Sequence, residues 1–169
     1  MAPLRRTTQA QRGHTPPLPQ QACHHQKVSV AAALWKTPGG RVRLAYRTYP
    51  NQNITSEDYA LFLEDLLTER LRRGPVLILH DRAKMHQGPP LEGLDSDYPR
   101  LLGFELLPAY APELNPVEEL WNWLKYDELA NFAPTDVAHL DRVIHRTLFP
   151  LHYSQPRLWT FLDNSPLKW

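Results

Sequence analysis

Two carboxylates lie where expected elements of secondary structure begin or end. Asp81 closes the apolar run "PVLILHD", and Glu118 falls in the first turn of a helix that begins near Asn115. Mg²⁺ takes oxygen ligands, keeps several waters, and needs only one or two protein carboxylates. Two such ions can activate a water and stabilise the leaving oxygen in phosphodiester cleavage. The pair therefore predicts a metal site in which both residues are catalytic.

Each acid also has a structural interpretation. A glutamate in the first turn of a helix is favoured by the helix dipole, so Glu118 suits a capping role. Asp81 suits a cap or turn after its strand. His86, five residues after Asp81, is placed to contact a phosphate or the water shell of a metal, and otherwise is a polar loop residue. Glu119 is expected to point more towards solvent.

The elements that position these acids follow an α/β order. We expect strands at 27–35 and 41–50 paired as a hairpin, and an amphipathic helix at 53–73. A short strand at 74–81 has the all-apolar pattern of one buried on both faces. A loop at 86–99, a strand at 104–110, helices at 115–129 and 135–149, and a tail that packs as a short helix complete the chain. This order predicts a central mixed sheet, with ligands at the carboxyl ends of its strands.

Charge is unevenly distributed over the 169 residues, although the net charge is only +1. The first 50 residues hold eight Lys and Arg and no Asp or Glu. Arg41, Arg43 and Arg47 alternate along the second expected strand and predict a basic face that binds DNA phosphates, with a solvated surface as the alternative. Lys125, on the helix after Glu118, is a further candidate for DNA contact.

Composition excludes several classes of protein. The sequence has no apolar run long enough to span a membrane, and its start has no apolar core typical of a signal peptide. The single cysteine, Cys23, excludes an internal disulfide and gives no zinc-site spacing. A cytoplasmic, nucleoid-associated location is therefore expected.

The segment "LPAYAPELNPVEELWNWLKYDELANFAP" resembles the terminal catalytic signature of DDE transposases, in the bacterial insertion-sequence branch of the mariner-related superfamily. The core of that pattern runs from Tyr110 to Trp121. "PVLILHDRAKMH" is similar to the family's second-aspartate segment, and 36 residues separate Asp81 from Glu118, near the family's usual spacing. "LRRTTQAQRGHTP" resembles the stretch after the family's first aspartate. The resemblance covers most of the chain to about residue 150.

The resemblance implies an RNase H-like fold in which three carboxylates hold two Mg²⁺ (or Mn²⁺) ions. Such enzymes hydrolyse DNA at transposon ends and join the freed 3′ hydroxyl to target DNA. Asp81 then corresponds to the second acid and Glu118 to the third. Residues 1–150 are expected to form a partial catalytic domain, an RNase H-like mixed sheet flanked by helices. Residues 151–169 are expected to form a tail packed on it or at an interface.

One departure from the family affects the expected activity. The family's first aspartate would fall before Met1, and no acid precedes Glu57. We therefore expect the chain to lack its first central strand and to be inactive alone. Three explanations account for the missing aspartate: a misplaced start codon, a frameshift between two reading frames, or a decayed copy.

The candidate partners are DNA at transposon ends and target, a second copy of the chain, and an upstream or frameshifted portion of the same transposase. The competing class is a non-catalytic DNA-binding or regulatory protein.

Overall fold

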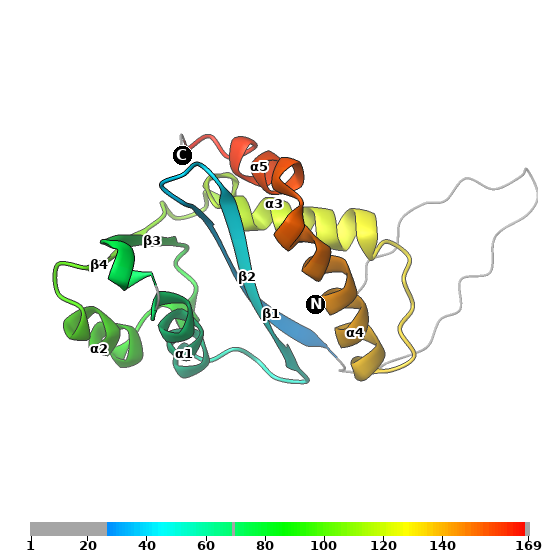
Figure 1. Cartoon of the computed structure of the whole chain (residues 1–169). Helices are drawn as coiled ribbons and strands as arrows, with labels where there is room; N and C mark the ends of the chain where they lie inside the picture. Colours follow the sequence, from blue (N-terminus) through cyan, green and yellow to red (C-terminus); the bar gives the residue numbers. More distant parts are fainter. Residues whose placement is uncertain (1–26, 69, 168–169) are drawn as a thin grey trace, which may run out of the picture.

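An antiparallel hairpin runs through the middle of the computed structural model, which describes residues 27–68 and 70–167 (Figure 1). Its strands are β1 (Val28–Lys36) and β2 (Val42–Pro50), paired from Val28↔Pro50 to Lys36↔Val42. The hairpin predicted for this region is confirmed. The segment 1–26, with the stretch that resembles the sequence after the family's first aspartate, lies outside the described residues.

A second sheet holds two parallel strands, β3 (Val76–His80) and β4 (Leu102–Leu106). Helix α2 (Pro89–Asp97) connects them, as parallel strands require a crossover. The pairing continues one step beyond the sheet, where the Leu107 N–H donates to the His80 carbonyl at 2.8 Å. Both strands therefore end at the same edge. The antiparallel and parallel pairings of a mixed sheet are both present, but among the described residues they form two separate two-stranded sheets.

Three further expectations for this region are wrong in detail. Residues 86–99 are not wholly a loop, because Pro89 and Pro90 occupy the first positions of α2, where proline costs no hydrogen bond. Strand β3 is not buried on both faces, since Leu77 is 62% exposed. The expected strand 104–110 begins and ends earlier as β4, and Pro108, which has no N–H to pair, follows its end.

Two helical layers cover opposite faces of the hairpin (Figure 1). Helix α1 (Ser56–Leu67) and α2 lie on one side, and α1 is capped by Thr55, whose hydroxyl accepts from the Asp58 N–H at 3.2 Å. Helices α3 (Pro116–Trp123), α4 (Val137–Leu148) and α5 (Gln155–Asp163) lie on the other side. A single π-helical turn, Leu124–Glu128, prolongs α3. The expected α/β class, with sheets flanked by helices, is confirmed.

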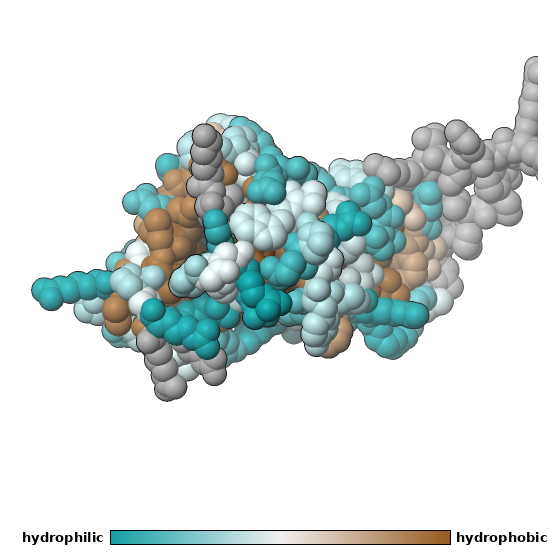
Figure 2. All heavy atoms as spheres, turned by 45° about the horizontal axis from the view of Figure 1, so that its top comes forward, coloured by the Kyte–Doolittle hydropathy of each residue, from teal (hydrophilic) through white to brown (hydrophobic). Residues whose placement is uncertain are grey.

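The two layers bury two separate hydrophobic clusters. The larger one joins the hairpin to α3, α4 and α5 and includes the fully buried Leu120, Leu124 and Ile144. The smaller one joins the hairpin and β3–β4 to α1 and α2 and includes Phe62 and Leu102. Apolar surface also remains outside, on the β3–β4 side of the molecule (Figure 2). No helix among the described residues has both the length and the apolar character to cross a membrane.

Candidate metal-binding acid pair

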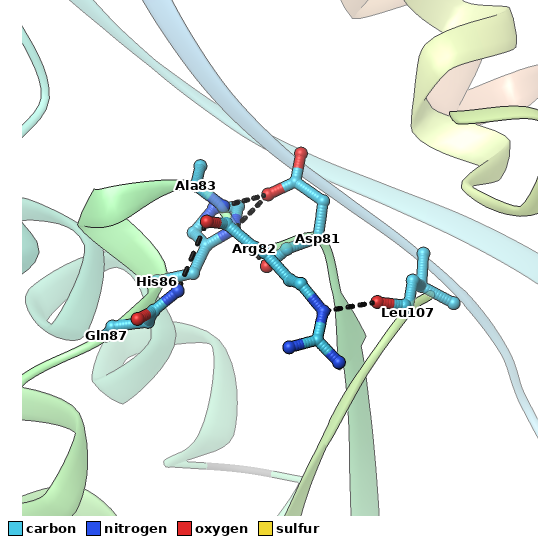
Figure 3. Close-up of polar contacts among 6 residues, drawn as sticks. All are labelled: Asp81, Arg82, Ala83, His86, Gln87 and Leu107. Carbon is cyan, nitrogen blue, oxygen red and sulfur yellow. Dashed lines mark hydrogen bonds and ion pairs between the residues drawn. The ribbon is translucent and has the colours of Figure 1, made fainter. Parts of the chain in front are cut away.

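Asp81 directly follows β3, at the edge where both parallel strands end. Its Oδ1 accepts a hydrogen bond from the Ala83 N–H at 2.9 Å and lies 2.6 Å from Nδ1 of His86. Arg82, next in the chain, turns away and donates from Nε to the Leu107 carbonyl at 3.3 Å. These contacts fix the loop after β3, and the other carboxylate oxygen of Asp81 points away from the donors (Figure 3).

Glu118 lies in the first turn of α3, which follows β4 in the chain. The side chain of Asn115 caps this helix by accepting from the Val117 N–H at 3.1 Å, and Pro116 occupies its first position. The Asn115 backbone N–H donates to the Pro112 carbonyl at 2.9 Å, so Glu118 does not complete a capping box. Among the described residues none donates a hydrogen bond to the Glu118 carboxylate. The part of the capping role that remains for Glu118 is the favourable interaction of its charge with the helix dipole.

The two carboxylates interact electrostatically. Burial raises the pKa of Glu118, Lys125 opposes this shift, and the negative charge of Asp81 adds to it. A half-buried carboxylate without a hydrogen-bond donor and within electrostatic reach of a second acid is costly to ionise. A divalent cation held by these carboxylates would offset that cost. The donor set therefore fits a hard cation such as Mg²⁺, which prefers carboxylate oxygens.

A third protein ligand is not supplied by the described residues. Within 27–68 and 70–167, no three His, Cys, Asp or Glu side chains lie together in a way that could hold a metal. Residues 1–26 contain no Asp or Glu either. Within the part of the chain that the structure describes, the acids at this site are thus Asp81 and Glu118.

Glu119 differs from Glu118 despite being its neighbour. Its Oε2 accepts from Nδ2 of Asn164 at 3.3 Å, so this carboxylate is turned to α5. It also lines a shallow pocket between α3 and α5, together with Trp123 and Arg157. Glu119 is therefore a matched control for experiments on Glu118.

The basic residues singled out from the sequence are dispersed. Arg41 and Arg43 are exposed at the start of β2. Arg47, further along β2, forms an ion pair with Asp65 of α1. Lys125 acts electrostatically on Glu118, where its charge opposes the rise in pKa that burial causes. The structure brings only Lys125 and His86 to the acid pair.

Two neighbours of the acid pair were missed in the sequence. Tyr59, on α1, and His80, the last residue of β3, lie beneath the loop that carries Asp81, with ring centroids 6.2 Å apart. Burial and the adjacent His86 lower the pKa of His80 to about 4, against an opposing effect of Asp81. Burial, then the charge of Asp81, raises the pKa of Tyr59. Tyr59 fits the apolar stripe of its helix, and no signal in the sequence placed it here.

The raised pKa of Glu118 predicts a pH-dependent gain in stability for Glu118→Gln. A carboxyl whose pKa is higher in the folded state than its ordinary value of 4.5 stabilises the fold below that value, and this contribution is lost as pH rises through the folded pKa. Without metal, Glu118→Gln should raise the melting temperature by a few degrees at about pH 7.5, and by nothing at about pH 3.5. Thermal unfolding at both pH values tests this, with Glu119→Gln as control. A lower melting temperature for Glu118→Gln at the higher pH would contradict the electrostatic assignment.

Two solved structures share the fold of this chain. A Mos1 strand transfer complex superposes with a TM-score of 0.58 at 16% identity, covering 97% of this chain and 47% of that one. A Mos1 transposase paired-end complex with left transposon end gives 0.57 at 16% identity, covering 97% and 48%. The chain thus spans just under half the length of these proteins, and its fold is of the RNase H-like class that they represent.

The family is shown by the sequence itself. A family model described as DDE superfamily endonuclease matches residues 1–141, so the chain belongs to that family. No curated protein matches the chain. The resemblance drawn from the sequence is confirmed at the level of the family, and its insertion-sequence branch remains a prediction.

Proposed function

We propose that this chain is the C-terminal part of a DDE transposase catalytic domain, in which Asp81 and Glu118 are two of three metal-binding acids. One observation carries the proposal: Glu118 is half-buried, accepts no hydrogen bond from a described residue, and lies within electrostatic reach of Asp81. The match to DDE superfamily endonucleases supports it. Asp81 directly follows β3 and Glu118 lies in the first turn of α3, so the two acids come from separate elements of the fold.

The proposed reaction is divalent-metal-dependent cleavage of DNA strands at transposon ends, followed by strand transfer to target DNA. Two Mg²⁺ ions, or Mn²⁺, would supply an activated water and stabilise the leaving oxygen. The chain's own part is to hold carboxylate oxygens at fixed positions for these ions. Transposon-end DNA is part of a similar solved complex, which supports DNA as the partner.

We further propose that a third carboxylate must come from additional polypeptide. Two acids hold metal more weakly than three, since each carboxylate contributes charge and an oxygen ligand. An upstream or frameshifted portion of the same transposase, or a second copy of the chain, is the proposed source. We also propose an insertion-sequence origin for the chain, which rests on the motif from Tyr110 to Trp121.

A plasmid-nicking assay tests these proposals. The purified 169-residue chain should not nick supercoiled DNA in Mg²⁺ or Mn²⁺. A longer polypeptide that supplies the third carboxylate should nick it, and Asp81→Ala should abolish that activity. Mg²⁺-dependent nicking by the 169-residue chain alone, lost on Asp81→Ala, would show that two acids suffice. Metal-dependent nicking by the longer polypeptide that survives Asp81→Ala would exclude the proposed site.

The exposed side chains of Arg41 and Arg43 favour a second candidate function, DNA binding without catalysis. Phosphate contacts of this kind make affinity fall steeply with salt concentration. DNA binding that is salt-sensitive, independent of Mg²⁺, and unchanged when both acids become alanine would support this alternative. Binding that strengthens with Mg²⁺ and weakens in the acid variants supports the transposase function.

A further inference from the structure

The loop after β3 folds back so that two donors reach the same oxygen of Asp81. The Ala83 N–H lies 2.9 Å from Oδ1, and Nδ1 of His86 lies 2.6 Å from it (Figure 3). The same nitrogen is 3.2 Å from the Asp81 carbonyl. Because a carboxylate and a carbonyl only accept, Nδ1 of His86 must carry the hydrogen. The Oδ1 atom of Asp81 is therefore held by His86 and Ala83, while the other carboxylate oxygen points away from both donors.

His86 is itself held by aromatic rings. Its ring centroid lies 4.3 Å from that of Tyr59 and 5.1 Å from that of His80. The side chain of His86 is 11% exposed, whereas that of Asp81 is 46% exposed. Tyr59 and His80 are both buried, and Phe104 of β4 packs on His80 at 5.6 Å. The imidazole of His86 thus packs between the buried rings of Tyr59 and His80 on one side and the more exposed carboxylate of Asp81 on the other.

We propose that His86 is a positioning residue that fixes the Asp81 carboxylate for metal binding. With Oδ1 bound by His86 and Ala83, Asp81 can present its second oxygen to a cation without paying to order its side chain. His86 then does not ligate the metal through Nδ1, and this role differs from the contact to a phosphate or to the water shell of a metal that the sequence predicted for it. This inference rests on the proposed role of Asp81 as a metal ligand.

Two substitutions of His86 separate the donor from the ring. His86→Phe keeps a ring against Tyr59 but removes the N–H, whereas His86→Asn loses the ring and keeps an N–H at a similar distance along the side chain. A role limited to packing predicts that the phenylalanine variant is the milder one. The positioning role predicts the reverse for metal binding.

Mn²⁺ affinity of the 169-residue chain, measured from the EPR signal of free Mn²⁺, gives the first readout. We expect His86→Phe to weaken binding by about tenfold or more, as is typical for partners that orient a metal ligand, and His86→Asn to restore most of it. If His86→Phe binds Mn²⁺ as tightly as the original chain while Asp81→Ala binds it more weakly, the positioning role is overturned and the metal site stands. No loss on Asp81→Ala would overturn the proposed metal site and this inference with it.

NMR of the unsubstituted chain gives the second readout, which needs neither a variant nor a metal. The nitrogen shifts of the His86 ring report which nitrogen carries hydrogen. A protonated Nδ1 in the metal-free protein supports the proposal. A bare Nδ1 with hydrogen on Nε2 would overturn it, because that ring form cannot donate to Asp81.

Discussion

Replacing Glu118 with glutamine is expected to lower the rate of DNA strand cleavage by at least about a thousandfold, in a polypeptide that holds all three acids. A metal ion stabilises charge in the transition state by several kcal/mol, and each 1.36 kcal/mol lost costs about tenfold in rate. Glutamine retains the size of the side chain, and α3 keeps its Asn115 cap. The loss should therefore appear in the rate of cleavage rather than in folding.

Glu119→Gln is the matched control for this experiment. Its carboxylate is turned to Asn164, the residue that follows α5, and glutamine can still accept from that side chain. We expect its cleavage rate to stay within about twofold of the original, as for a surface change away from the site. Equal losses in the two variants would mean that the charge of the α3 amino terminus, rather than a specific ligand, supports cleavage.

Leu120→Ala is expected to lower the free energy of unfolding by about 3 kcal/mol, within the usual range for leucine in a core. Leu120 is fully buried in the larger hydrophobic cluster, two residues beyond Glu118 on α3. Removing its side chain leaves a cavity between α3 and the hairpin. The same change should weaken Mn²⁺ binding, because α3 positions Glu118. Urea unfolding measures the first effect and metal titration the second.

An exposed leucine provides the comparison for this core position. Leu61, on α1, is 55% exposed, so Leu61→Ala should change stability by no more than about 0.5 kcal/mol. If Leu120→Ala cost no more than Leu61→Ala, the packing of α3 against the hairpin would be wrong. The placement of Glu118 would then be wrong as well.

Much of the fold was predictable from local patterns in the sequence. The hairpin follows from alternation on either side of "TPGG", and α3 follows from Asn115 and Pro116, whose preferences for a helix start are strong. The positions of Asp81 after a strand and of Glu118 in the first turn of a helix were also predictable, and their role as metal ligands stays a proposal. The membership in the DDE family was predictable from the signature around Glu118.

Features that depend on tertiary contacts were not predictable. Helix α2 was hidden because the prolines that begin it also suit a loop. The exposure of Leu77 depends on what covers β3, and an apolar run alone does not reveal that. The contact between His86 and Asp81 requires a turn in the chain between these two residues. It also requires the ring of Tyr59, from α1, to pack against His86. Such a contact has no periodic signal in the chain.

Metal binding by the acid pair is the central claim, and calorimetric titration of the 169-residue chain with Mn²⁺ tests it most directly. Four proteins would be compared: the original chain, Asp81→Asn, Glu118→Gln and Glu119→Gln. We expect measurable binding by the original chain and by Glu119→Gln, and a loss of at least about tenfold in each of the other two. Equal binding by all four proteins, or none by the original chain, would contradict the claim.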